Sequence, residues 1–403
     1  MKYIDRHNTC SVKFDDLKSR FGRDDLIPLW VADMDFETPV CVRRALQKVI
    51  DEGVYGYNTI PSGYYMVIQN WLNTMQNWPV SQEWLTYIPG IIKGIGYVVN
   101  YFTHIGDGVI VQPPVYPPFM AVPRGNGRKI IFNPLILSED GSYEMDFDNL
   151  IEIGESGAAK LLILCNPHNP GGIRWSRETL FRLAEICLKY KILVISDEIH
   201  ADMQLWGNTH VPFASVSVAA QKISITFGAP SKTFNMAGIV SSYAIVPNKL
   251  IRDPFYKWLT VNELNAPTIF STSCAIAAYL GGNSWRREML KYIEENILAV
   301  EEQCKKTNLI RPLRPGASFL IWLDCRKLSD MLAVKYPDKL QELSDDRQKL
   351  LVDFFINKTK LALNDGATFG PGGEGYMRLN IGTGREIIEE SMQRILSEIS
   401  FLF

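Results

Sequence analysis

Three residues with chemically useful side chains, Asn169, Asp197 and Lys232, each follow a run of apolar residues. The runs are 161–165, 192–196 and 223–227, in that order. An amine, a carboxylate and an amide suit a cofactor that joins an aldehyde to a pyridine ring. The amine condenses with the aldehyde to form a Schiff base, and the carboxylate keeps the ring nitrogen protonated so that the ring accepts electrons. The amide donates to the phenolic oxygen of the ring.

Each of the three has an ordinary structural interpretation when taken alone. Lys232 is then a solvated surface lysine, Asp197 a cap or turn residue, and Asn169 part of an Asn-Pro turn. Successive members of the set are, however, separated by about one strand–helix–strand unit. Because the carboxyl ends of parallel strands lie at one edge of a sheet, we expect the three side chains to converge there.

The remaining parts of a pyridoxal phosphate site also have candidates. Tyr116 lies in a proline-rich loop and stacks on the ring, unless it is ordinary packed core. The segment 90–94 opens a predicted helix that runs to Phe102, so the backbone amides near Ile92 and Lys93 can bind the phosphate. Arg378 can hold a substrate carboxylate with two hydrogen bonds, although it also suits a surface ion pair.

Composition limits the function classes. The chain has 403 residues, 46% of them hydrophobic, and 42 basic against 44 acidic side chains, so it has no basic block to attract nucleic acid or a membrane surface. Neither a signal peptide nor a membrane span is evident, and we expect a cytoplasmic protein. The seven cysteines include no Cys-x-x-Cys pair, which favours reduced thiols, and the five histidines lack zinc-type spacing, so no metal is expected.

The pattern of apolar runs predicts an α/β protein with two lobes. Between about residues 90 and 246, short apolar runs alternate with helix-like segments, which is typical of a mostly parallel sheet covered on both faces. Long charged helices, at 286–305 and 345–358, and short strands follow and predict a smaller α+β lobe. We expect an N-terminal segment (1–45) that packs with the small domain, a large cofactor-binding domain (46–285) and a small C-terminal domain (286–403).

With these residues in place, the chain resembles the fold type I pyridoxal-phosphate enzymes of the aspartate aminotransferase superfamily over essentially its whole length. More narrowly, it resembles the MalY/PatB group of cystathionine β-lyases, also called cysteine-S-conjugate β-lyases. The matching segments are 29–36 (Leu-Trp-Val-Ala-Asp-Met-Asp-Phe), 55–57, 113–119, 166–170 (Asn-Pro-His-Asn-Pro), 197–200 (Asp-Glu-Ile-His), 231–238 and 378–380.

The resemblance implies a role for several residues. It implies covalent attachment of the cofactor at Lys232, with the ring held by the residues proposed above. It also implies that Tyr57 reaches the cofactor phosphate of a neighbouring subunit, which makes the active site part of a homodimer interface. Tyr57 as a core aromatic is the alternative. Ala32 is expected to lie near the substrate carboxylate through its backbone, opposite Arg378, with Asn169 also close to the substrate.

Three positions depart from the pattern of the relatives. Many aminotransferases carry a phosphate-binding arginine where this chain has Val240, so the phosphate depends more on the 90–93 loop and on Ser231. His200 stands where many relatives place a tyrosine, which weakens the expected contact to the phenolic oxygen, and this histidine also suits a simple turn cap. The run 380–385 differs from the Cys-Pro associated with the group.

The resemblance implies a carbon–sulfur β-lyase that converts cystathionine or a related cysteine S-conjugate to pyruvate, ammonia and a thiol. Lys232 removes the α-proton and the β-thiolate then leaves. Tyr116 and Tyr57 are expected to assist. The same residues also serve an aminotransferase, and a cofactor-binding regulatory protein is a third alternative. The sequence does not rank one cysteine S-conjugate above another.

Overall fold

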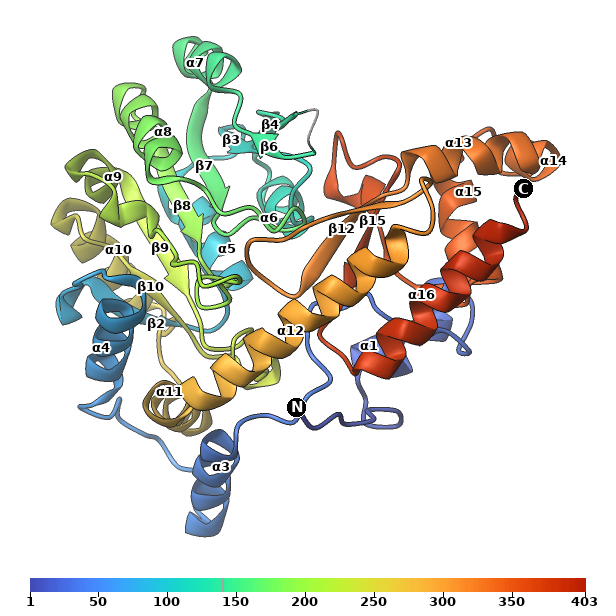
Figure 1. The fold of residues 1–403 in the computed structure, drawn as a ribbon. Coiled ribbons are helices and arrows are strands. Elements are labelled where there is room, and N and C mark those ends of the chain that lie inside the picture. The colour runs from blue at the N-terminus through green and yellow to red at the C-terminus, as the bar shows by residue number, and fades with distance from the viewer. Residues whose placement is uncertain (139–140) are drawn as a thin grey trace.

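The computed structural model describes residues 1–138 and 141–403, and its main feature is a seven-stranded sheet (Figure 1). The strands, in spatial order, are β2 (Leu85–Ile88), β10 (Ser242–Ile245), β9 (Ser224–Gly228), β8 (Leu193–Asp197), β7 (Ala159–Cys165), β3 (Gly108–Val111) and β4 (Lys129–Phe132). β10 runs antiparallel to both its neighbours, and the remaining pairs are parallel. The predicted α/β class with a mostly parallel sheet is therefore confirmed.

Helices cover both faces of this sheet, which explains why its strands are nearly continuous apolar runs. On one face, Leu162 and Val194 pack in one core cluster with α7 (Phe147–Ser156), α8 (Arg177–Lys189) and α9 (Val218–Ile223). The opposite face packs against α5 (Ile91–Phe102), α6 (Pro118–Gly125) and α10 (Lys249–Val261). The large lobe also contains the helices α3 (Val40–Glu52), α4 (Tyr64–Gln76) and α11 (Ile269–Gly281).

The small lobe is built on a four-stranded antiparallel sheet. Its strands, in spatial order, are β11 (Arg311–Leu313), β12 (Leu320–Asp324), β15 (Tyr376–Asn380) and β14 (Asn364–Asp365). The long helix α12 (Asn283–Cys304) extends from the large lobe to this sheet and lies beside α16 (Arg385–Ser400) (Figure 1). The smaller helices are α13 (Arg326–Lys335), α14 (Pro337–Glu342) and α15 (Arg347–Asp353).

One predicted helix of the small lobe differs in the structure. The sequence predicts a single charged helix from Asp345 to Lys358. In the structure, Asp346 caps the start of α15, and the helix gives way after Asp353 to a π-helical turn, Phe354–Lys358. This turn places Phe354 and Phe355 in the core. The pattern of charged residues along the segment predicts a regular helix and gives no sign of the turn.

The N-terminal segment lies against the small lobe. It contains α1 (Val12–Asp15), α2 (Leu17–Phe21) and β1 (Ile27–Pro28), and β1 pairs in parallel with β13 (Leu361–Ala362). The exact domain boundaries stay a prediction. Within residues 1–138 and 141–403, no helix is long and apolar enough to cross a membrane. The cytoplasmic location also stays a prediction.

Candidate cofactor site

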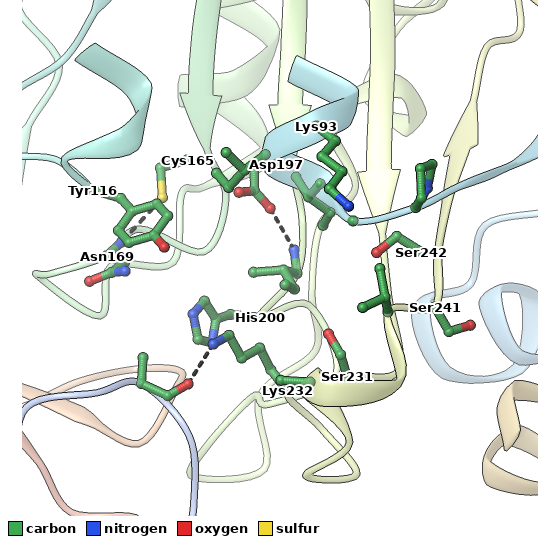
Figure 2. Close-up of a pocket in the computed structure, with 18 of the residues that line it drawn as sticks. Lys93, Tyr116, Cys165, Asn169, Asp197, His200, Ser231, Lys232, Ser241 and Ser242 are labelled. Carbon is green, nitrogen blue, oxygen red and sulfur yellow. Dashed lines mark hydrogen bonds between the residues drawn. The ribbon is translucent and has the colours of Figure 1, made fainter. Parts of the chain in front are cut away.

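A cavity of about 310 Å³ lies beyond the carboxyl ends of β7, β8 and β9 (Figure 2). Because these strands are neighbours in the sheet, residues far apart in sequence meet at this edge. The predicted site residues that line the cavity are Ala32, Ile92, Lys93, Tyr116, Asn169, Asp197, His200, Ser231 and Lys232. The structure therefore brings together all the predicted residues except Arg378 and Tyr57.

Lys232 lies in the turn after β9 and points into the cavity, so its interpretation as a solvated surface lysine is wrong. Its Nζ donates a hydrogen bond to the carbonyl of Ala32. Burial lowers the pKa of this amine to about 8, an effect that Asp33 opposes and Arg378 adds to. A substantial fraction of the amine is therefore neutral near pH 8, as attack on a carbonyl carbon requires.

Asp197 is the last residue of β8 and is buried. One carboxylate oxygen accepts a hydrogen bond from the backbone amide of Ile199 at 3.0 Å. Burial raises the pKa of this carboxyl to about 7. A cationic partner in the cavity would keep Asp197 ionised, and a protonated pyridine nitrogen is such a partner.

Asn169 is held by one contact of its backbone and one of its side chain. Its backbone amide donates to the sulfur of Cys165 at 3.3 Å, and its Oδ1 accepts a hydrogen bond from Arg378 at 3.1 Å. Since Oδ1 already faces a guanidinium, Nδ2 is left as a donor toward the cavity. Cys165, at the end of β7, also lines the cavity.

The end of the cavity that suits a phosphate is formed by backbone amides and hydroxyls. α5 begins after Gly90, whose positive φ of 103° favours glycine, and no side chain caps its first turn. Ser231 and Ser242 complete this end, and Ser241 also lines the cavity, although its hydroxyl points away from it in Figure 2. The Ser242 hydroxyl points toward the cavity in Figure 2. The sequence analysis missed Cys165, Ser241 and Ser242, although the two serines directly follow Val240, where an arginine is absent.

Arg378 lies on β15 behind Asn169 and does not line the cavity itself. It is buried, with 4% of its surface exposed, so it is not the surface ion-pair residue of the alternative interpretation. Its guanidinium donates to Asn169, to the Trp30 carbonyl at 2.8 Å and to Asn364 at 2.6 Å, and its Nε has no partner among the described residues. All these acceptors are neutral, and burial lowers the pKa of Arg378 to about 10.

Tyr57 lies outside the cavity. It is fully exposed and lies in a segment, 53–61, whose residues are all exposed, so its interpretation as a core aromatic is wrong. The segment touches the rest of its own chain through a few contacts, such as the Tyr55 ring beside Phe270 and the Asn58 amide on the Pro267 carbonyl. A single chain therefore leaves Tyr57 without any site to act on.

His200 is buried beside Lys232, and its Nδ1 has no partner among the described residues. Burial lowers the pKa of its imidazole to about 3, and the positive charges of Lys232 and Arg378 act in the same direction. A neutral imidazole at this position can donate or accept one hydrogen bond without adding charge to the cavity. A phenol at the same position would instead donate through its hydroxyl.

The donors and acceptors of the cavity fit pyridoxal phosphate. The Lys232 amine would react with the aldehyde of the cofactor, the buried Asp197 carboxylate would pair with its ring nitrogen, and the Asn169 amide would donate to its phenolic oxygen. The start of α5 and the Ser242 hydroxyl suit the phosphate. When bound there, this cofactor supplies an aldehyde for amine exchange and a ring that accepts electrons from the substrate α-carbon.

Comparison with known proteins agrees with this geometry. Residues 24–395 match the model of the family described as aminotransferase class I and II. The chain belongs to this family. The predicted superfamily and fold are therefore confirmed, and fold type I places the family among the pyridoxal-phosphate-dependent enzymes.

Individual relatives extend the match to the MalY/PatB group. The chain is 40% identical to cystathionine beta-lyase PatB of Bacillus subtilis (strain 168) over 401 residues, or 99% of both proteins. It is 29% identical to protein MalY of Escherichia coli (strain K12), covering 99% of this chain and 98% of the relative. The solved PLP-bound C-S lyase from Staphylococcus hominis is 30% identical, with a TM-score of 0.87 and coverage of 98% and 97%. The resemblance to this group is confirmed.

Proposed function

We propose that this protein is a pyridoxal-phosphate-dependent carbon–sulfur β-lyase. It cleaves cystathionine or a related cysteine S-conjugate, with water, to a thiol, pyruvate and ammonia. The observation that carries the proposal is an intact cofactor cavity in a chain that matches a cystathionine beta-lyase over its whole length. The partly neutral Lys232 amine and the buried Asp197 carboxylate support it from the geometry.

The charge and position of each residue in the cavity indicate its role in the reaction. Lys232, once released from the cofactor, takes the proton from the substrate α-carbon, because its lowered pKa leaves a neutral amine available. Asp197 would hold positive charge at the ring nitrogen of the bound cofactor, and Asn169 would hold its phenolic oxygen. Arg378, which reaches the edge of the cavity at Asn169, and the backbone N–H of Ala32 would hold the substrate carboxylate, and this would direct the α-proton toward Lys232. Tyr116 covers the ring.

Incubating the cofactor-loaded protein with L-cystathionine should release free thiol and pyruvate in equal amounts. Thiol is measured with a chromogenic disulfide and pyruvate with a coupled dehydrogenase. L-Alanine, which has no β-leaving group, serves as the matched control substrate and should yield neither product. Stoichiometric conversion of the cofactor to its amine form by L-alanine, reversed by a keto acid and without thiol release from any S-conjugate, would instead establish an aminotransferase.

We also infer a homodimer in which each Tyr57 completes the site of the partner subunit. The exposure of the whole 53–61 segment supports this, since its side chains find almost no surface on their own chain. The end of the cavity that suits the phosphate contains backbone amides and hydroxyls but little buried positive charge. A hydroxyl donor from the partner subunit would therefore add a hydrogen bond to the phosphate.

Mixing two inactive variants tests the shared site. A chain with Lys232→Ala and a chain with Tyr57→Ala are unfolded together and refolded together. If Tyr57 acts across the interface, each mixed dimer holds one complete site, and about a quarter of wild-type activity should return. If Tyr57 acts within its own chain, no mixed dimer holds a complete site. Activity no higher than the sum of the separately refolded variants would contradict the shared site.

A further inference from the structure

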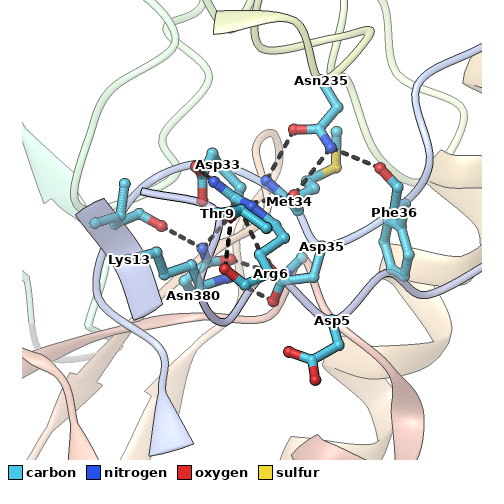
Figure 3. Close-up of polar contacts among 12 residues, drawn as sticks. Asp5, Arg6, Thr9, Lys13, Asp33, Met34, Asp35, Phe36, Asn235 and Asn380 are labelled. Carbon is cyan, nitrogen blue, oxygen red and sulfur yellow. Dashed lines mark hydrogen bonds and ion pairs between the residues drawn. The ribbon is translucent and has the colours of Figure 1, made fainter. Parts of the chain in front are cut away.

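The segment 31–36, here called the strap, passes between the two lobes and carries the Ala32 carbonyl to Lys232. Asn235 holds it from the large lobe, accepting from the Met34 amide at 3.1 Å and donating to the carbonyls of Met34 and Phe36. Asn380 of β15 holds it from the small lobe by donating to the carbonyls of Val31 and Asp33 (Figure 3). The backbone around Asp33 is therefore fixed from both sides.

The side chain of Asp33 is only partly neutralised. One oxygen, Oδ2, pairs with Arg6 at 2.8 Å, while Oδ1 is buried and has no partner among the described residues. Arg6 is shared, because it also contacts Asp35 at 3.3 Å. Asp35 in turn pairs with the fully buried Lys13 at 2.7 Å. Asp33 therefore retains negative charge that Arg6 does not fully cancel.

That charge acts on Lys232, because Asp33 directly follows the residue whose carbonyl receives the amine. Four ionisable groups interact electrostatically with the amine: Asp33 on the strap, Asp197 at the end of β8, Arg378 on β15 and His200 just after β8. Burial lowers the pKa of Lys232, Asp33 and Asp197 oppose this effect, and Arg378 adds to it. Neither Asp33 nor Arg6 is among the residues that line the cofactor cavity.

We propose that Asp33 is a positioning residue that sets the charge of the Lys232 amine, and that Arg6 limits its influence. The inference rests on the proposed function, in which Lys232 transfers the α-proton. A nearby carboxylate favours the ammonium form, and an arginine on that carboxylate opposes it. Lys232 needs both forms during a catalytic cycle, neutral to accept the proton and charged to return it. Through Asp33, Arg6 of the N-terminal segment thus influences the fraction of Lys232 that is protonated.

The pKa of Lys232 can be measured in the cofactor-free protein, without substrate, by labelling amines with acetic anhydride across a pH series. Only a neutral amine reacts, so the midpoint of labelling at the Lys232 peptide, followed by mass spectrometry, reports this pKa. The wild-type midpoint is expected near pH 8. Asp33→Asn should lower it by roughly half to one pH unit, and Arg6→Gln should raise it by a similar amount.

The opposite signs separate an electrostatic role from a purely structural one. Loss of structure would move both midpoints in one direction, toward that of an exposed lysine. Asp5→Asn, which removes an exposed carboxylate from the same N-terminal segment, is the matched control and should leave the midpoint unchanged. An unchanged midpoint in folded Asp33→Asn protein, or shifts of equal sign in the two variants, would overturn the proposal.

Folding failure of one variant leaves the test intact. If Asp33→Asn does not fold, as judged by circular dichroism, Arg6→Gln protein that is folded by the same measure decides alone, and a midpoint that does not rise in it refutes the inference. The labelling is also independent of the reaction catalysed. Absence of thiol release together with the expected midpoint shifts would remove the lyase proposal while leaving the Asp33 assignment in place.

Discussion

Replacing Lys232 with alanine is expected to reduce thiol release from L-cystathionine by at least about 10⁴-fold. The variant loses both the amine that binds the cofactor covalently and the base that takes the α-proton. The cavity should still bind pyridoxal phosphate, because Asp197, Asn169 and the start of α5 do not depend on this side chain. The measurement is the initial rate of thiol release, together with the cofactor content of the dialysed protein.

Two comparisons make the Lys232 result specific. Lys222→Ala removes an exposed lysine from α9, far from the proposed chemistry, and should keep wild-type activity. Adding a small primary amine to Lys232→Ala should restore a measurable part of the rate, because a diffusible base can enter the vacated space. Residual activity above about one hundredth of the wild type, with no added amine, would show that another group removes the α-proton.

Replacing Arg378 with methionine is expected to lower kcat/KM for L-cystathionine by about 10²- to 10³-fold, or roughly 3–4 kcal/mol of lost transition-state binding. The physical reason is that Arg378 is a buried cation whose contacts in the chain are all neutral. The substrate carboxylate would be its missing anionic partner. Arg378→Lys keeps the charge but loses the fork of donors, and an intermediate fall is expected.

A substrate without the carboxylate separates this role from a general loss of structure. The S-alkylated cysteamine that matches an S-alkylcysteine has the same amine and leaving group but no carboxylate. Binding of this amine should differ little between wild type and Arg378→Met, whereas binding of the cysteine conjugate should weaken strongly. Equal weakening of both would mean that Arg378 supports the site through Asn169 and Trp30 rather than through the substrate. Thermal unfolding of both proteins controls for stability.

The sequence predicted those parts of the site that depend on local pattern and chain direction. Asn169, Asp197 and Lys232 each follow an apolar run, and the crossover units between them predict adjacent parallel strands. Their side chains therefore had to meet at the carboxyl edge of the sheet. The start of α5 at Ile91 was also predictable from local pattern, because Gly90 precedes an apolar helical run. The predicted helix 345–358 was wrong in its second part, because α15 gives way to a π-helical turn at Phe354.

Other features depend on contacts between distant segments, which local pattern does not encode. The acceptors of Arg378 come from Trp30, Asn169 and Asn364, and only the packing of the two lobes shows that none is anionic. The exposure of Tyr57 became evident only in the folded chain.

The sequence by itself determined the cofactor chemistry of this protein, since residue type and strand spacing are local properties. The electrostatic setting of Lys232 was decided only by the tertiary structure. Asp33 and Lys232 are almost two hundred residues apart, and the strap brings them together through amide contacts from both lobes. Charge interactions act through space and depend on burial, so the order of residues along the chain does not reveal them.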